Sequence, residues 1–193
     1  MGRLLSASGY CISLYGSGEE LLAQLPASAP GCILLDLDMP GLSGLALQDR
    51  LAEEAPLLPI VFLTGHGDVR ASVQAMKAGA DDFLEKPATS ESLLNAIAGA
   101  LHRAASRRDE LDRTHAARSR LASLTPREFE VLRLLVRGKL NKQIAYALGT
   151  SERTIKAHRH NLMEKIGARS LAETVSIAER LGLVDSVDDQ LRP

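Results

Sequence analysis

One stretch in the second half of the chain constrains the fold most strongly, because it combines a tight turn, a helix cap and a core residue at fixed spacing. Residues 141–160 read NKQIAYALGTSERTIKAHRH. Ala145 is small enough for two helices to cross closely, and Gly149 lies four residues later, where a sharp turn needs a positive φ. Ser151 can cap a second helix, and Ile155 can anchor that helix in a core. This spacing predicts a helix-turn-helix rather than an ordinary solvated helix of a bundle.

The second helix of this motif carries side chains that suit contact with DNA. Arg153, Lys156, Ala157 and His160 follow one another at spacings i, i+3, i+4 and i+7, so they share one outward face. Hydrogen-bond donors with a small residue among them allow a helix to lie against base edges and phosphates. The motif therefore predicts a DNA-binding surface on this helix.

Charge is divided unequally along the chain, although the formal net charge is only −1. Residues 1–99 hold 5 Lys or Arg against 12 Asp or Glu, whereas residues 121–193 hold 12 against 9. The basic excess is concentrated in residues 137–169, with 8 basic side chains against 2 acidic ones. An acidic first half and a basic patch around the helix-turn-helix indicate two domains with different tasks.

The two cysteines, Cys11 and Cys32, lie in apolar runs and are interpreted as buried free thiols of a protein in a reducing cytoplasm. Two thiols at this separation are too few for a zinc site. No apolar run approaches the length that crosses a membrane, and no signal peptide is visible. We therefore expect a cytoplasmic protein without a membrane partner.

Apolar runs and amphipathic stretches alternate along the first hundred residues. A continuous apolar run such as CILL at 32–35 is typical of a strand that is covered on both faces, as in parallel sheets. We expect strands at 11–15, 32–35, 59–64 and 80–85, and helices at 1–9, 17–25, 43–55 and 68–78. This alternation predicts a doubly wound α/β domain.

A helical pattern then runs from Ser90 to about Ser119, with Gly99 as its one potential breaker, and its second half is strongly charged. Such a helix suits a solvated linker that could pair with a second copy. Beyond it, a capping box at Thr125 and Glu128 opens the first of four expected helices. We expect a first domain at 1–100, a linker helix at 101–120, an all-α four-helix domain at 121–184 and a tail at 185–193.

Polar residues stand at the carboxyl ends of three predicted strands: Asp36, Thr64 and Lys86. In open α/β sheets these strand ends meet at one edge, where ligands bind. A carboxylate can accept a phosphoryl group as an acyl phosphate, and a hydroxyl and an ammonium can bind the phosphoryl oxygens. Each residue alone is more often a strand-end cap or a solvated charge, but their joint placement predicts a phosphoryl-accepting site.

Longer motifs around these residues resemble known families. DLDMPGLSG at 36–44, LTGHGD at 63–68 and FLEKP at 83–87 resemble the receiver domain of bacterial response regulators, which has a flavodoxin-like fold. The segment 124–171 is similar to the DNA-binding domain of the NarL/FixJ (LuxR-type) family. Together the two resemblances cover nearly the whole chain, in the order found in the regulators of styrene and nitrogen-fixation genes.

The resemblance implies that a sensor histidine kinase phosphorylates Asp36. Thr64 and Phe83 match the family's switch pair, a hydroxyl and an aromatic ring that repack together. Lys86 matches the phosphate-binding lysine, and the resemblance implies a cis peptide between it and Pro87. Mg²⁺ is the cofactor expected for the family, with the Asp36 carboxylate and the backbone carbonyl of Asp38 as its ligands here.

The sequence departs from the receiver pattern at its start. The family strand order is 2-1-3-4-5, and the first strand, which ends in two adjacent acids that hold Mg²⁺, has no counterpart before the strand at 11–15. Asp81 and Asp82 do not replace those acids, because they precede the last strand at its opposite end. We therefore expect a receiver that lacks its first strand and binds metal weakly.

Two explanations of this departure remain open. The native protein could start upstream of Met1, which the intact strand context of Asp36, Thr64 and Lys86 favours. Alternatively, a degenerate receiver could switch without phosphate.

The resemblance also implies roles in the second domain. The base-facing positions of the family are matched by Lys156, Ala157 and His160. Contacts to phosphates are expected from Lys142, Arg153, Thr154 and Arg159. The family's dimer contact is matched by Leu171, Val175 and Ala178, with core packing as the alternative. Asn141 is expected to cap the first helix of the motif.

By the same resemblance, phosphorylation reshapes the face formed by residues 68–78, 80–85 and the helix from 90 onward. Two copies then pair and bind DNA half-sites about one helical turn apart. The implied partners are DNA, a sensor histidine kinase, RNA polymerase and a second copy of the chain, and the implied outcome is activation of transcription.

Two other functions are compatible with parts of the sequence. LLDLD at 34–38 also resembles the nucleophile motif of haloacid-dehalogenase-type phosphatases. That family needs acids on a strand after the lysine, whereas this chain continues into a helix, so we do not expect an enzyme or a catalytic residue. The remaining alternative is a regulator that binds DNA without phosphorylation and uses a degenerate receiver only for dimerisation.

Overall fold

The computed structural model describes residues 2–25, 31–65 and 69–183. The chain divides into two compact units, Met1–Arg108 and Asp109–Pro193, which are described in turn. The predicted tail at 185–193 and the HGD part of the motif at 63–68 lie outside the described residues.

The first unit is built on a parallel sheet. Its strands β1 (Ile33–Leu35), β2 (Ile60–Thr64) and β3 (Asp82–Glu85) pair in the order β1-β2-β3. Every residue of the central strand β2 is buried, as its continuous apolar sequence requires. Leu35 pairs with Phe62 and Thr64 pairs with Glu85, so the carboxyl ends of the strands lie at one edge.

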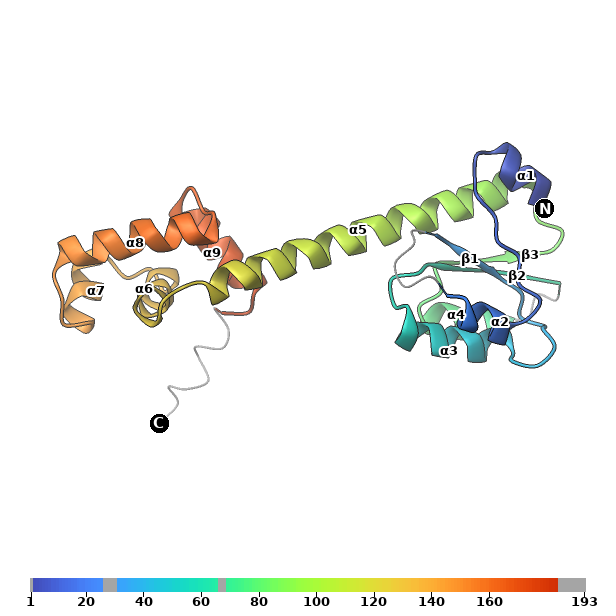
Figure 1. Ribbon diagram of the computed structural model, residues 1–193, viewed down its shortest axis with the longest axis horizontal. Helices are drawn as coiled ribbons and strands as arrows, with labels where there is room; N and C mark the ends of the chain where they lie inside the picture. Colours follow the sequence, from blue (N-terminus) through green and yellow to red (C-terminus); the bar gives the residue numbers. More distant parts are fainter. Residues whose placement is uncertain (1, 26–30, 66–68, 184–193) are drawn as a thin grey trace. The chain divides into compact units, whose positions relative to one another are not determined.

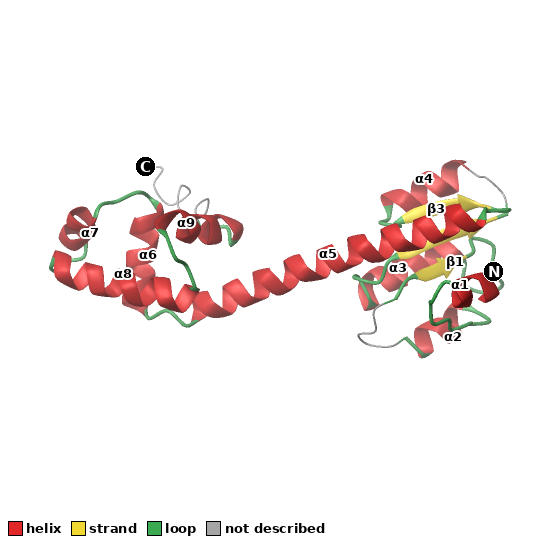
Figure 2. Ribbon diagram, turned by 90° about the horizontal axis from the view of Figure 1, so that it is seen from above, coloured by secondary structure: helices red, strands yellow, loops and turns green. Residues whose placement is uncertain are grey.

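Helices cover both faces of this sheet (Figure 1). On one face lie α2 (Gly18–Ala23), α3 (Gly44–Glu54) and α4 (Val69–Lys77). On the other face lie α1 (Gly2–Ala7) and the first part of α5 (Ser90–Ala122), as the view in Figure 2 also shows.

Successive strand residues point to opposite faces, which divides the core into two parts. Phe62 packs with Leu47 and Leu51 of α3. Its neighbour Val61 packs with Ala96 and Ala100 of α5. The arrangement confirms the predicted doubly wound, flavodoxin-like α/β fold.

The prediction of a strand at 11–15 is wrong for the described residues, where this segment has no regular structure. Ile12 packs against the cluster under α5, and Tyr15 packs against the cluster under α3, but no ladder forms. In the expected strand order the partner of this segment is the first strand, which the described residues do not contain. Without that partner the backbone groups of 11–15 have no ladder to join. Cys11 is consequently exposed rather than buried, while Cys32 is partly buried.

The predicted long helix is present as α5, which runs for 33 residues from Ser90 to Ala122. Its buried residues are confined to its first third: Leu93, Ala96, Ile97 and Ala100. No helix of the described chain is long and apolar enough to cross a membrane.

Four helices follow α5 in the described part of the second unit. They are α6 (Pro126–Val136), α7 (Asn141–Ala147), α8 (Glu152–Ile166) and α9 (Leu171–Arg180). Their core includes Leu132, Ile144 and Ile155, each at most 2% exposed. The predicted turn is present, because Gly149 has a φ of 61° and Ser151 caps α8 by accepting from the amide of Thr154 at 3.2 Å. Ala145 is 5% exposed, as expected for a helix crossing.

The prediction that Asn141 caps α7 is wrong. The cap is Leu140, whose amide donates to Gln143 Oε1 at 2.9 Å. Asn141 is the first helical residue, and its Oδ1 accepts from Arg159 Nη1 at 2.6 Å. The side chain is therefore used to join α7 to α8.

The predicted capping box of α6 is complete and reaches across the unit. Glu128 is 4% exposed, and its Oε2 accepts from the Thr125 amide at 2.8 Å and from Lys165 Nζ at 2.7 Å. The lysine hydrogen bond first, and then the Thr125 amide, hold the pKa of Glu128 below its usual 4.5. One carboxylate thus stabilises the start of α6 and ties it to the end of α8.

We expect Glu128→Gln to destabilise the second unit by about 1–2 kcal/mol at neutral pH, because the amide cannot replace a charged acceptor for Lys165. A carboxyl whose pKa is lowered by folding stabilises the fold above its unfolded pKa and loses this effect as pH falls through the folded pKa. The stability gap between wild type and variant should therefore be full above pH 4.5 and close in more acidic solution. Urea unfolding of both proteins from pH 7 to pH 3 measures this gap, and a gap that is independent of pH contradicts the assigned role.

Candidate functional site

The structure brings together the three polar residues that were expected to converge. Asp36 directly follows β1, Thr64 is the last residue of β2, and Lys86 directly follows β3. Lys86 forms an ion pair with Asp36 Oδ2, and its amide donates to the Thr64 carbonyl at 2.7 Å. The peptide between Lys86 and Pro87 is cis, as the resemblance implied.

The acidic and basic side chains of this site are open to solvent, whereas the hydroxyl residue is not. The side chain of Asp36 is 34% exposed and that of Lys86 is 41% exposed, but Thr64 is only 1% exposed. The amide of Asp38 lies 3.4 Å from Asp36 Oδ1, a long hydrogen bond. A carboxylate at the open edge of a sheet, beside an ammonium, can be approached by a phosphoryl donor and can share the resulting negative charge with the lysine.

Gly44 allows the loop after Asp36 to close tightly. A Cβ on Gly44 would lie 2.4 Å from the carbonyl oxygen of Asp36 and 3.1 Å from the ring of Phe62, so no other residue fits there without a shift. Ser43 caps α3 and accepts from the Ala46 amide at 3.3 Å. The start of α3 is thereby packed directly beneath the backbone of Asp36.

Glu19 of α2 holds the same loop from outside, a role that sequence reasoning missed. Its Oε1 accepts from the Leu42 amide at 3.1 Å. Hydrogen bonds from its own amide, the Ser17 hydroxyl and the Leu42 amide keep the pKa of Glu19 below its usual value. In the sequence Glu19 is simply an acid in the first turn of a helix. Leu42 lies 23 residues further along the chain, and only the fold brings the two residues together.

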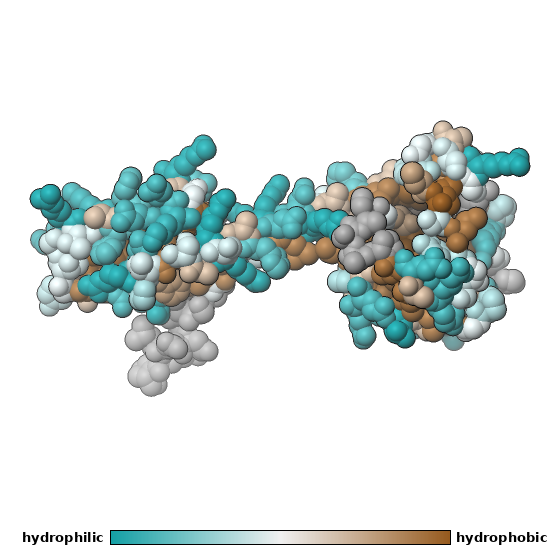
Figure 3. All heavy atoms as spheres, viewed as in Figure 1, coloured by the Kyte–Doolittle hydropathy of each residue, from teal (hydrophilic) through white to brown (hydrophobic). Residues whose placement is uncertain are grey.

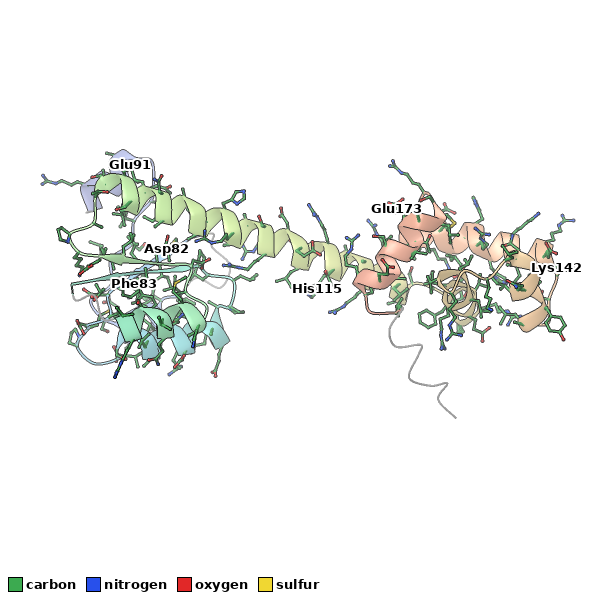
Figure 4. All side chains as sticks on the ribbon, turned by 180° about the vertical axis from the view of Figure 1, so that it is seen from behind. Asp82, Phe83, Glu91, His115, Lys142 and Glu173 are labelled. Carbon is green, nitrogen blue, oxygen red and sulfur yellow. The ribbon has the colours of Figure 1, made fainter. Side chains whose placement is uncertain are left out.

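Phe83 lies in β3 on the same face of the sheet as Thr64. It pairs with Phe62 in the ladder, and the two ring centroids are 6.3 Å apart. Thr64 is two residues beyond Phe62, so its side chain leaves the same face. Figure 4 shows Phe83 on β3, on the side of the sheet that carries α2, α3 and α4. The hydroxyl and the aromatic ring therefore share one layer between sheet and helices.

The described residues do not form a complete Mg²⁺ site. They contain no group of three or more His, Cys, Asp or Glu side chains that could hold a metal ion. Asp36 is the one carboxylate at this edge that the predictions assigned to metal, and it is paired with Lys86. Asp81 and Asp82 lie at the opposite end of β3. Mg²⁺ in proteins is held by one or two carboxylates with phosphate and waters, and we assign no step to it here.

The predicted nucleic-acid interface lies on α7 and α8. Ile155 and Leu162 are fully buried, which directs the other side of α8 outward. The exposed members of the predicted set are Lys142, Arg153, Thr154, Lys156, Ala157 and His160. Figure 3 shows largely hydrophilic atoms over α8, and Figure 4 shows Lys142 on the outer side of α7.

Two residues of the predicted set also have partners within the unit. Arg159 is partly buried and donates to Asn141, so it joins the two helices of the motif. Thr154 Oγ1 lies 2.9 Å from Ser151 Oγ in the cap of α8. Arg127, which the predictions did not include, donates to the Leu148 carbonyl and thereby ties α6 to the end of α7.

The three residues predicted at a dimer contact have different surroundings. Leu171 is 41% exposed and Val175 is partly buried, but Ala178 is 1% exposed and belongs to the core of the unit. Ala178 is therefore out of reach of a second copy in this conformation.

Both halves of the chain match known families. Residues 1–98 match the response regulator receiver domain, and residues 122–178 match the bacterial regulatory proteins of the luxR family. Response regulator protein TodT of Pseudomonas putida is 41% identical over 181 residues, which cover 94% of this chain and 80% of the relative. Transcriptional regulatory protein FixJ of Bradyrhizobium diazoefficiens is 40% identical over 184 residues, which cover 94% and 89%.

The chain is also similar to solved structures of response regulators. The response regulator StyR superposes with a TM-score of 0.82 at 42% identity, covering 92% of this chain and 90% of that one. Full-length FixJ from B. japonicum gives a TM-score of 0.55 at 39% identity, covering 94% and 90%. The chain therefore belongs to the two-component response regulators of the NarL/FixJ type, transcriptional regulators that join a receiver domain to a LuxR-type DNA-binding domain.

Proposed function

We propose that a sensor histidine kinase phosphorylates this regulator on Asp36, and that the phosphorylated chain dimerises on promoter DNA and activates transcription. The observation that carries the proposal is the ion pair of Asp36 with Lys86 at the edge where β2 ends in Thr64. We assign residues 1–100 to the receiver, 101–120 to the linker helix and 121–184 to the DNA-binding domain.

The chemistry uses groups that lie at this edge and a phosphohistidine donor. An Asp36 carboxylate oxygen attacks phosphorus, the bond from phosphorus to the histidine nitrogen breaks, and an acyl phosphate forms. Lys86 then transfers its charge-assisted hydrogen bond from the carboxylate to a phosphoryl oxygen. The buried Thr64 hydroxyl turns toward another phosphoryl oxygen, and the ring of Phe83 follows into the space that is left.

A stripe of apolar side chains on α4 supports pairing of two receivers. Val69, Val73 and Met76 are 73%, 47% and 46% exposed and are spaced i, i+4 and i+7, so they lie on one side of the helix. Exposed apolar side chains that adjoin one another are typical of an interaction surface. Because α4 packs beside β3, repacking of Phe83 would alter the presentation of this stripe.

In the second domain α8 is proposed to enter the major groove. Lys156, Ala157 and His160 face base edges, while Lys142, Arg153, Thr154 and Arg159 contact phosphates. RNA polymerase is the proposed recipient of the activated complex.

A regulator that binds DNA without phosphorylation remains the second candidate. It is favoured by the incomplete set of metal ligands beside Asp36 in the described residues. In that case the receiver serves for dimerisation alone.

We expect Asp36→Asn to abolish phosphorylation, because an amide cannot form the acyl phosphate. Asp38→Asn, which removes an exposed neighbouring carboxylate, serves as the matched control and should still be labelled. Intact-protein mass spectrometry after incubation with acetyl phosphate and Mg²⁺ detects the added phosphoryl group. Labelling of wild type and of Asp38→Asn, but not of Asp36→Asn, supports the proposal. An unlabelled wild-type chain that still binds DNA supports the second candidate.

We expect Lys156→Ala to weaken binding to selected DNA by about 1–3 kcal/mol and to relax the base preference at one position. Arg153→Ala should weaken binding to all sequences similarly and lower the salt dependence by roughly one counterion. Fluorescence anisotropy with duplexes enriched from a random library, at several salt concentrations, separates the two effects. Arg180→Ala, an exposed arginine on α9, is the control, and equal losses in all three variants would contradict the placement of α8 in the groove.

A further inference from the structure

A second charged cluster lies at the amino end of β3, opposite the phosphoacceptor edge. The side chain of Asp81 is 4% exposed, and two arginines of α5 contact it. Arg103 Nε lies 3.4 Å from Asp81 Oδ1, and Arg103 Nη2 donates to the Asp81 carbonyl at 2.8 Å. Arg107 Nη1 donates to Oδ1 at 3.1 Å, and its Nη2 lies 3.4 Å from Oδ2. The arginines thus engage both carboxylate oxygens and the backbone of one residue.

Asp81 is itself tied to the sheet. Its Oδ2 accepts from the Ile60 amide at 3.3 Å, and its own amide donates to the Ile60 carbonyl at 2.8 Å. Both contacts are made at the start of β2. A nearly buried carboxylate that is bonded to β2 on one side and to α5 on the other connects the sheet to the helix directly.

This Asp81 clamp, formed by Asp81, Arg103 and Arg107, begins where the apolar attachment of α5 ends. The last buried residue of α5 is Ala100. Arg103 lies within one turn of it and Arg107 lies two turns beyond it, and both side chains are nearly half exposed. No core residue of the described first unit packs α5 beyond Leu101, so polar contacts must hold the helix there.

Gly99 of α5 lies beside the guanidinium of Arg103. A Cβ on Gly99 would lie 3.2 Å from Arg103 Nη1, so the guanidinium would have to move by a few tenths of an ångström to accommodate it. Glycine in a helix interior costs roughly 1 kcal/mol relative to alanine. Glycine at this position leaves the Arg103 guanidinium room to turn back toward Asp81.

We propose that the Asp81 clamp fixes residues 102–107 of α5 to the receiver and so determines where the interdomain helix leaves it. The division of the chain into two units between Arg108 and Asp109, one residue beyond Arg107, agrees with this assignment. Asp81 is a positioning residue, because it acts on the DNA-binding domain only through α5. The strand that it precedes carries Phe83 and leads into Lys86, so a shift of β3 reaches α5 through the clamp. The attachment of α5 by the clamp does not rest on the proposed phosphorylation of Asp36.

Hydrogen–deuterium exchange of the full chain tests this proposal. Replacing both arginines, in Arg103→Gln/Arg107→Gln, removes the clamp while leaving the nearly buried residues of the first unit in place. We expect backbone amides of residues 102–110 to exchange about tenfold faster, while those of 93–100 keep their wild-type rates. Arg108→Gln is the matched control, because Arg108 is the neighbouring exposed arginine of the same helix and takes no part in the contacts to Asp81 described above.

Aspartate variants and the salt dependence of exchange provide two further tests of the clamp. Asp81→Asn should reproduce the effect. Asp82→Asn should not, because the carboxylate of Asp82 accepts from the Phe83 amide at 2.8 Å and lies outside the clamp. About 0.5 M NaCl should accelerate exchange at 102–110 in wild type but not in the double variant, because half-exposed ion pairs are screened. Unchanged exchange at 102–110 in the double variant would overturn the proposal, as would equal acceleration across the whole receiver.

Discussion

The central strand β2 is the constraint on which the first domain depends. It pairs in parallel with β1 on one side and with β3 on the other, and all five of its residues are buried. This pairing sets the register that ends three strands at one edge and so places Asp36, Thr64 and Lys86 together. The same strand begins at Ile60, whose backbone binds Asp81 at the opposite edge. One strand thus supports both charged clusters of the receiver, one at each end.

The two clusters differ in how they expose their carboxylates, and this difference suits the roles proposed for them. Asp36 is about one-third exposed and is paired with a single flexible lysine, which can follow an incoming phosphoryl group. Asp81 is nearly buried and is engaged by two arginines and a backbone amide, an arrangement that favours a fixed geometry. Phosphoryl transfer needs an accessible carboxylate, whereas attachment of a helix needs a carboxylate whose oxygens are all hydrogen-bonded.

Local sequence signals predicted most elements correctly, because the signals act within a few residues. Apolar runs predicted the three observed strands, and side-chain caps at Thr125 and Ser151 predicted the helices that begin after them. The strand expected at 11–15 did not form, because a strand needs a hydrogen-bonding neighbour as well as a suitable sequence. The local sequence predicted that Asn141 caps a helix. Its actual role was not predictable in this way, because its partner Arg159 lies 18 residues away.

The sequence by itself determined the α/β architecture, the helix-turn-helix, the family and the convergence of Asp36, Thr64 and Lys86 at one edge of the sheet. Those features follow from periodicity, caps and motif spacing, which are readable within short windows. Only the tertiary structure decided that Glu19 holds the loop after Asp36, that Ala178 is a core residue, and that Arg103 and Arg107 converge on Asp81. Each of these contacts joins residues from different elements, and a single charged side chain carries no mark of its distant partner until packing brings the two together.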